Sequence, residues 1–191
     1  MSQQELLRKV IGVLEASGTA YMVTGSFVSS VQGEPRASHD IDVIVSLSDA
    51  GVDALLKAFP APRYYLDSFA ITAARSSKEK FRQFNLLDPE EGDKVDFWLL
   101  SDEPYDQARF ARRYSDELDG IQAMISRPED TILMKLVWSD LSGGSPKQLG
   151  DALRVYEIQF RRLDLDYLQR WADQLHVSPL LREIRSRAKP L

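Results

Sequence analysis

Two aspartates inside an apolar, strand-forming segment place the strongest constraint on this chain. Residues 40–46 form a short β-rich run, and Asp40 and Asp42 lie within it. Side chains two residues apart on a strand project from the same face, whereas Ile41 between them points into a core. Two carboxylates held side by side repel each other, and ionised carboxylates are costly to desolvate. A bound cation would remove both costs.

The chemistry of these carboxylates favours a hard divalent ion. Mg²⁺ binds carboxylate oxygens and keeps water and phosphate oxygens as its other ligands. The sequence KVDFWLL predicts a second strand with one apolar face, and Asp96 lies on the other face of that strand. If this strand neighbours residues 40–46, three carboxylates converge in a two-metal arrangement. The alternative is that Asp96 lies exposed on a sheet edge or pairs with a lysine or an arginine.

A glycine–serine pair precedes the acidic strand. Gly25 allows close approach of the backbone to a ligand, and Ser26 adds a hydroxyl at the start of an expected helix, where free N–H groups favour phosphate. The pair therefore predicts a phosphate-binding turn. The alternative is a tight strand–helix turn with Ser26 as the helix cap. The P-loop pattern GxxxxGK[ST] is absent from the sequence.

Bulk composition excludes several classes of protein. The chain has 191 residues, which corresponds to one good-sized domain or to a domain with a small appendage. Zero cysteines exclude disulfides and thiolate metal sites, and two histidines, His39 and His176, are too few for a histidine-based zinc cluster. The sequence has no membrane-length apolar run and no signal-peptide pattern, so we expect a cytoplasmic protein. The net charge of −5 provides no overall basic field for nucleic acid.

The order of periodic segments predicts mixed α/β structure followed by helices alone. We expect a mixed α/β core over residues 1–125 and a helical C-terminal subdomain over residues 126–191, packed together. The expected strands are 20–24, 40–46, a hairpin of 81–88 and 94–100 around the turn PEEGD, and 121–125. The expected helices are one ending before Gly18, one from Gly25 to near Gly33, and 48–59, 66–76, 103–113, one through Trp138 opened by a capping box at Ser126, 146–161, 165–175 and 179–187.

These motifs together resemble a known family. The residues that carry the resemblance are Gly25 and Ser26, Asp40 and Asp42, and Asp96. Their order is similar to that of the nucleotidyltransferase superfamily of the DNA polymerase β type. The phrases GEPRASHDIDVIV, FNLLDPEEGDKVDF and PEDTILMKLVWS look similar to bacterial AbiEii-like and related minimal nucleotidyltransferases, some of which act as toxins. The resemblance covers most of residues 20–175.

The resemblance implies a fold and a reaction. The fold is α/β (α+β): a small mixed sheet flanked by helices, then a helical part. The three aspartates would bind Mg²⁺, with Mn²⁺ as an alternative ion. The reaction would transfer a nucleoside monophosphate from an NTP to a hydroxyl of a tRNA, a protein or a small molecule and release pyrophosphate. A protein partner, such as an antitoxin, or a homo-oligomer would fit this family.

Three further residues are candidates for nucleotide binding. The resemblance matches Lys135 and Asp151 to a family lysine and aspartate, although the usual Arg-Asp pair reads Gly150-Asp151 here. Lys135 lies in an apolar helix and would either reach the triphosphate or extend to solvent. Asp151 would cap a helix, pair with Lys135 or act as a base. Arg36 would hold phosphate or lie in solvent as a loop arginine.

Two rival functions remain open at the level of sequence. The first is a binding or regulatory protein that keeps the fold without the chemistry, for example in a toxin–antitoxin system. The second is a glycosyltransferase that uses Asp-x-Asp to hold a nucleotide-sugar, although that class normally needs a longer chain. Metal-dependent NTP binding without turnover would distinguish the first rival from an enzyme.

Overall fold

The computed structural model describes residues 3–38, 40–79 and 81–189. The chain divides into two compact units, and each unit combines segments that are distant in the sequence. The first unit comprises Met1–Thr24 and Ser38–Ile125, and the second comprises Gly25–Ala37 and Ser126–Leu191. Residues 25–37, which lie within the segment expected to form the core, therefore belong to the helical unit. No helix in the described part of the chain is long and apolar enough to cross a membrane.

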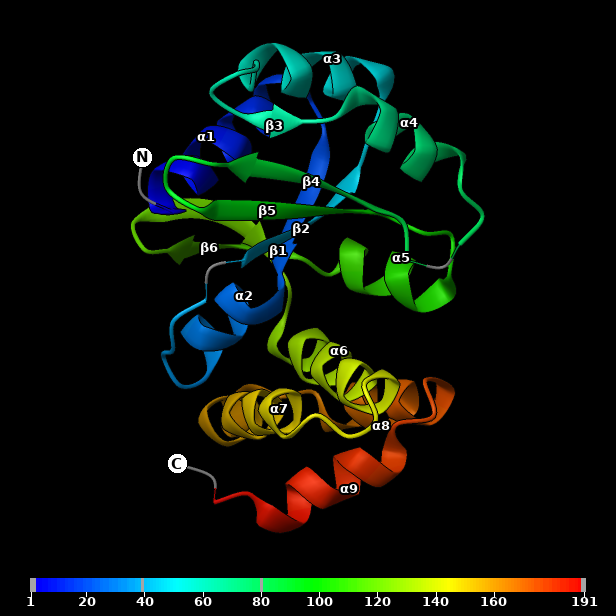
Figure 1. Cartoon of the computed structure of the whole chain (residues 1–191). Coiled ribbons are helices and arrows are strands. Elements are labelled where there is room, and N and C mark those ends of the chain that lie inside the picture. The colour runs from blue at the N-terminus through cyan, green and yellow to red at the C-terminus, as the bar shows by residue number, and fades with distance from the viewer. Residues whose placement is uncertain (1–2, 39, 80, 190–191) are drawn as a thin grey trace. The chain divides into compact units, whose positions relative to one another are not determined.

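The first unit is built on one mixed β-sheet. Within the described residues, seven strands pair in the order β3-β4-β5-β2-β1-β7-β6. The strands are β1 (Ala20–Thr24), β2 (Asp40–Ser46), β3 (Tyr65–Leu66), β4 (Gln83–Asp88), β5 (Asp93–Leu99), β6 (Tyr114–Leu118) and β7 (Ile121–Ile125). The helices of this unit are α1 (Gln3–Ala16), α3 (Asp49–Ala58), α4 (Ser68–Ser76) and α5 (Pro104–Ala111). Figure 1 shows these elements in the blue-to-green part of the chain.

Strand register brings the expected site strands together. β2 pairs in parallel with β5, and it pairs antiparallel with β1 on its other side. β4 and β5 form the expected antiparallel hairpin. β2 and β5 are thus inner strands, and their alternate residues Ile41, Val43, Val95 and Phe97 are fully buried. The opposite face of the same strands carries the acidic side chains.

The second unit is helical. It contains α2 (Gly25–Gln32), α6 (Pro128–Leu141), α7 (Pro146–Gln159), a 3₁₀ turn (Phe160–Arg162), α8 (Leu165–Gln174) and α9 (Ser178–Arg187). α2 packs against α6 and α7. The Gln32 amide donates to the Ser126 carbonyl (2.6 Å), and the Gln159 amide donates to the Gln32 carbonyl (2.8 Å). A Cβ on Gly33 would lie 3.1 Å from the Val155 nitrogen, so a glycine permits this close approach.

Most expected elements are present, and the differences have local causes. Ser48 caps α3 and Asp164 caps α8 through side-chain hydrogen bonds to backbone N–H groups. The expected capping box at Ser126 is wrong, because the N-cap of α6 is Arg127 and the Ser126 hydroxyl bonds to the Thr131 hydroxyl instead. Two short strands, β3 and β6, were not expected.

Candidate functional site

Three carboxylates lie on one face of the first unit's sheet. Asp40 and Asp42 are two residues apart on β2, and the parallel register places Asp42 directly opposite Asp96 on β5. The two outer members of the group differ in solvent exposure: the Asp40 side chain is 57% exposed, whereas the Asp96 side chain is 11% exposed. The two strands are therefore neighbours, as the three-carboxylate interpretation required. Asp96 lies on an inner strand, so an exposed sheet edge does not explain it.

A lysine lies between two of these carboxylates. Lys94 is opposite Asp40 in the β2–β5 register and precedes Asp96 by two residues on the same strand face. Its ammonium lies 2.8 Å from Asp96 Oδ2 and 3.5 Å from Asp40 Oδ1. The hydrogen bond to Asp96 raises the pKa of Lys94 above its ordinary value. The pairing with a lysine, one of the alternatives for Asp96, is present in this structure.

Neutral donors bond to one oxygen of Asp42 and to one oxygen of Asp96. The Trp98 indole N–H donates to Asp42 Oδ1 at 3.0 Å. Asn85 lies opposite Asp96 on β4, and its amide nitrogen donates to Asp96 Oδ1 at 2.8 Å in the amide orientation that satisfies both groups. These contacts fix Asp42 and Asp96 in place, while Asp40 at the start of the strand projects into solvent.

The donor set fits a hard divalent ion in kind. Three carboxylates on adjacent strands supply the oxygen ligands that Mg²⁺ or Mn²⁺ uses. In the described residues, however, no three acidic or histidine side chains surround a common point that could hold an ion. The position between Asp40 and Asp96 holds the Lys94 ammonium, which shows that this face attracts a cation. Ion binding there would require the exposed Asp40 side chain to turn and Lys94 to leave.

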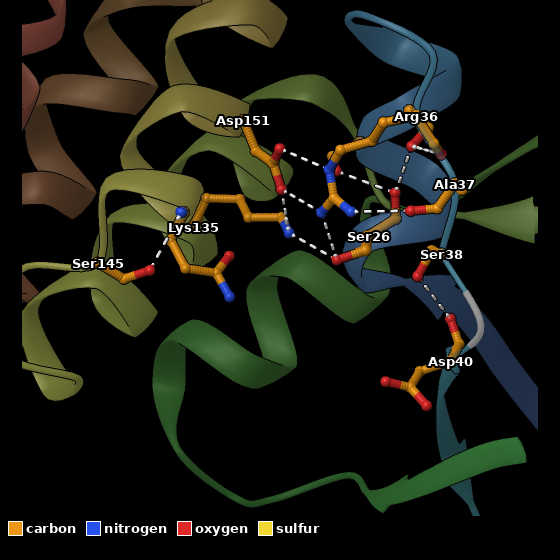
Figure 2. A network of polar contacts seen from close by, with 11 residues as sticks. Ser26, Arg36, Ala37, Ser38, Asp40, Lys135, Ser145 and Asp151 are labelled. Atoms are coloured by element: carbon orange, nitrogen blue, oxygen red, sulfur yellow. Dashed lines mark hydrogen bonds and ion pairs between the residues drawn. The ribbon is translucent and has the colours of Figure 1, made fainter.

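The second unit contains a separate polar network around Asp151. Figure 2 shows Arg36 and Lys135 converging on this carboxylate. Arg36 donates from Nε to Asp151 Oδ1 (2.9 Å) and from its terminal nitrogen to Oδ2 (2.6 Å), a bidentate ion pair. Lys135 Nζ lies 2.8 Å from Asp151 Oδ2. Arg36 is therefore not a solvent-exposed loop arginine, and Lys135 does not extend to solvent, because its side chain is only 5% exposed.

Ser26 is the common neutral acceptor of this network. Its hydroxyl oxygen accepts from Arg36 at 2.8 Å and from Lys135 at 3.1 Å. Ser26 follows Gly25, which adopts a positive φ of 73° at the start of α2, a conformation that glycine adopts without strain. Two cationic side chains therefore donate to this one hydroxyl. Such donors suit an anion such as phosphate.

The charge state of Asp151 follows from its neighbours. Burial disfavours the charged carboxylate, but hydrogen bonds from Arg36 and Lys135 outweigh burial and hold the Asp151 pKa below its ordinary value of 3.8. Both Asp151 oxygens accept hydrogen bonds from Arg36 or Lys135, and the lowered pKa makes this carboxylate a weaker base. The salt-bridge alternative for Asp151 is the one that the structure contains.

Some site residues were not among the sequence candidates. Lys94 and Asn85 contact Asp96 directly, and neither was singled out. The Lys-x-Asp spacing of Lys94 and Asp96 carried a signal, because residues two apart share a strand face. Asn85 offered no such signal, since its place depends on the hairpin register. His39 lies outside the described residues.

Comparison with known proteins identifies the fold. No family model matches the chain, and no curated protein matches it. A crystal structure of an antigenic nucleotidyltransferase-like protein from Paracoccidioides brasiliensis aligns with a TM-score of 0.54 at 14% identity, covering 99% of this chain and 94% of that chain. The chain has the nucleotidyltransferase fold. ANT(2'')-Ia in complex with adenylyl-2''-tobramycin aligns with a TM-score of 0.53 at 14% identity over 98% of this chain and 99% of that chain.

These alignments confirm the predicted fold class. A solution structure of ANT(2'')-Ia, described as an antibiotic-resistance factor, also aligns, with a TM-score of 0.51 at 13% identity. The alignments cover nearly the whole chain, including the C-terminal helices. A particular closeness to the AbiEii-like group stays a prediction.

Proposed function

We propose that this chain is a Mg²⁺-dependent nucleotidyltransferase that transfers a nucleoside monophosphate from an NTP to a hydroxyl. One observation carries the proposal: Asp42 and Asp96 lie opposite each other on adjacent parallel strands of a nucleotidyltransferase fold, with Asp40 two residues before Asp42. An inner strand with an acid at its centre is unusual, because aspartate is depleted from strands. A catalytic role supplies the reason.

In this proposal the carboxylates hold the ions. Asp40 and Asp42 would bind the ion that accompanies the triphosphate, and Asp96 would complete a second ion site. Bound Mg²⁺ would neutralise phosphate charge and polarise the reacting oxygens. Asp96 is also the proposed acceptor of the proton from the attacking hydroxyl. The hydrogen bonds from Trp98 and Asn85 would keep Asp42 and Asp96 oriented for these roles.

The second group of residues would bind phosphate. We assign Gly25 and Ser26 to the β- and γ-phosphates, with Arg36 and Lys135 offsetting negative charge as the transition state forms. Asp151 would orient both cations, because it already bonds to each of them. Catalysis would rest mainly on positioning and charge neutralisation, as in other phosphoryl and nucleotidyl transfers.

The proposed chemical step is a substitution at the α-phosphorus. The acceptor oxygen forms a bond to that phosphorus as the bond to the bridging oxygen breaks. Pyrophosphate leaves with the electron pair of the broken bond, and the hydroxyl proton passes to Asp96. The products are the nucleotidylated acceptor and pyrophosphate.

The acceptor class belongs to the same proposal. ANT(2'')-Ia was crystallised with adenylyl-2''-tobramycin, so one protein of this fold is associated with a small-molecule hydroxyl. A small molecule is our first choice of acceptor, with a tRNA or a protein as the alternatives, and we place the reaction in the cytoplasm. A toxin role would follow if the acceptor were an essential tRNA or protein. A protein partner or a homo-oligomer is compatible with each of these acceptors.

One observation favours a second candidate function. Lys94 bonds to both Asp40 and Asp96 and so satisfies two of the three proposed ion ligands within the chain. A protein in which this lysine never leaves would be a non-catalytic binding or regulatory protein with the same fold. NTP binding that needs no divalent ion, together with the absence of transfer, would support this candidate over the enzyme.

The test is label transfer from each of four α-labelled NTPs with Mg²⁺. Cell-extract RNA, cell-extract protein and aminoglycosides would be offered separately as acceptors. We expect label in one acceptor class, and we expect Asp42→Ala to abolish it with an unchanged circular dichroism spectrum. Asp53→Ala, which removes an exposed carboxylate from α3, is the matched control and should keep full activity. Unchanged transfer by Asp42→Ala would refute the assignment.

A further inference from the structure

Lys94 occupies an unusual position for a surface lysine. Its ammonium lies 2.8 Å from Asp96 Oδ2 and 3.5 Å from Asp40 Oδ1, and only 32% of its side chain is exposed. Asp96 is 11% exposed, so its charge is poorly screened by water. The lysine therefore acts as a counter-ion for a nearly buried carboxylate. Its ammonium lies among the three aspartates that are proposed to hold the metal ions.

Strand geometry fixes the lysine in this position. Lys94 and Asp96 are two residues apart on β5 and share a face, while the parallel register places Lys94 beside Asp40 on β2. Both strands are inner strands whose backbones are held by ladder hydrogen bonds on both sides. The ammonium cannot leave the carboxylates by movement of the backbone. It can leave only by rotation of its own side chain, and its partial exposure permits this.

We propose that Lys94 is a built-in competitor of the divalent ion at the Asp40–Asp96 pair. This inference rests on the proposed function and adds to it. An ion and an ammonium cannot both lie between the same carboxylate oxygens, so ion binding must expel Lys94. The consequence is weak binding of a free ion at this pair, with tight binding reserved for an ion that binds while the triphosphate is present. The expelled ammonium then becomes available to the anionic nucleotide.

The primary test is direct measurement of ion binding without nucleotide. Mn²⁺ would be titrated into the intact chain and followed by electron paramagnetic resonance of the free ion. Lys94→Met removes the charge and keeps the length of the side chain. We expect this variant to bind Mn²⁺ about tenfold more tightly than the wild type, because the competing ammonium is gone. A tenfold change in the dissociation constant corresponds to about 1.4 kcal/mol. Lys78→Met removes the charge of an exposed lysine from the same unit and should bind like the wild type.

Two further variants keep the test decisive. Lys94→Gln removes the charge but keeps a hydrogen-bond donor, so it should also tighten Mn²⁺ binding if Lys94→Met does not fold. Asp96→Asn should abolish tight binding in either background. A second readout is the unfolding temperature, which we expect Lys94→Met to lower without the ion and Mn²⁺ to restore.

The outcomes separate this inference from the proposed function. If the wild type binds Mn²⁺ through Asp96 but neither Lys94 variant binds it more tightly than Lys78→Met does, the competition is overturned and the enzyme proposal stands. If neither the wild type nor the Lys94 variants bind Mn²⁺, the inference and the proposed ion site are both wrong. Tighter binding by both Lys94 variants supports the inference.

Discussion

At the scale of single residues, Asp151 is the carboxylate that balances the charges of two cationic side chains in the helical unit. This one carboxylate accepts hydrogen bonds from Arg36 and Lys135, and the Lys135 side chain is only 5% exposed. A buried ammonium without its counter-charge is strongly destabilising. The stability of the unit should therefore depend on this acid even though its proposed role lies in nucleotide binding.

We predict that Asp151→Asn lowers the free energy of unfolding by about 3 kcal/mol, because it leaves the buried Lys135 and its neighbour Arg36 without their carboxylate. Urea denaturation followed by circular dichroism measures the change. Asp140→Asn, an exposed acid at the end of α6, is the control and should change stability by less than about 0.5 kcal/mol. Equal effects of the two substitutions would contradict the account.

The pH dependence of stability should carry the same signature. The Asp151 pKa lies below its ordinary value of 3.8 in the folded chain, so the unfolded chain takes up this proton first as pH falls. The stabilisation by Asp151 is thus complete above 3.8 and disappears as pH falls through the folded pKa. We expect the stability difference between the wild type and Asp151→Asn to shrink below that pH. A constant difference across the acid range would be inconsistent with the depressed pKa.

Residue spacing predicted part of the site and left part of it open. The two-residue spacing of Asp40 and Asp42 indicated a shared strand face, and both residues lie on β2, whose register places Asp42 opposite Asp96. The pairing of Arg36 with Asp151 joins residues that are 115 apart in sequence, so only the folded chain can reveal it. Local spacing specifies a face, but it does not specify which distant partner reaches that face.

At the scale of elements, the helix α3 shows how capping and close packing act together. Ser48 accepts a hydrogen bond from the Gly51 backbone N–H and so caps the helix. A Cβ on Gly51 would lie 2.5 Å from the Thr19 hydroxyl and 3.0 Å from a Leu47 methyl. The glycine therefore serves packing, since its φ is an ordinary helical one.

We predict that Gly51→Ala lowers the free energy of unfolding by about 1–3 kcal/mol through overpacking. Gly12→Ala is the matched comparison, because a Cβ on Gly12 in α1 meets no atom within 4 Å. That substitution should instead raise stability by about 0.5–1 kcal/mol through helix propensity. Thermal denaturation of the two variants measures both signs, and a stabilised Gly51→Ala would contradict the packing at Thr19.

The elements that sequence analysis missed share a physical cause. β6 ends the sheet, and its central residues Ser115, Asp116 and Glu117 are all exposed, so it lacks the apolar alternation of a half-buried strand. β3, Tyr65–Leu66, is also terminal and is too short to carry a period. Inner strands were predicted well because burial on the core face imposes the alternation. Edge strands form through pairing, which sequence periodicity does not report.

At the scale of the whole molecule, the chain assembles its two units from interleaved segments. Residues 25–37 lie between β1 and β2 in sequence but pack with the C-terminal helices. No change of composition marks this exchange, so a linear division at residue 126 could not include it. The consequence is that α2 should share the stability of α6 and α7.

We predict that Val155→Ala, at a fully buried position of α7, lowers unfolding stability by about 2 kcal/mol. It should also lower the hydrogen-exchange protection of α2 more than that of β2. Val45→Ala, at a fully buried position of β2, should show the opposite preference. Hydrogen exchange with mass spectrometry resolves both patterns. A larger loss of hydrogen-exchange protection in α2 than in β2 after Val45→Ala would contradict the division into units.

The measurement that tests the central claim most directly compares the fate of two labels in one reaction. The intact chain, Mg²⁺ and the acceptor class identified by the α-label screen would be incubated with the same NTP labelled at the α- or at the γ-phosphorus. Nucleotidyl transfer predicts α-label in the acceptor and γ-label in pyrophosphate, with both signals lost in Asp42→Ala. Label from the γ-position in the acceptor, or no transfer of either label while NTP still binds, would contradict the account.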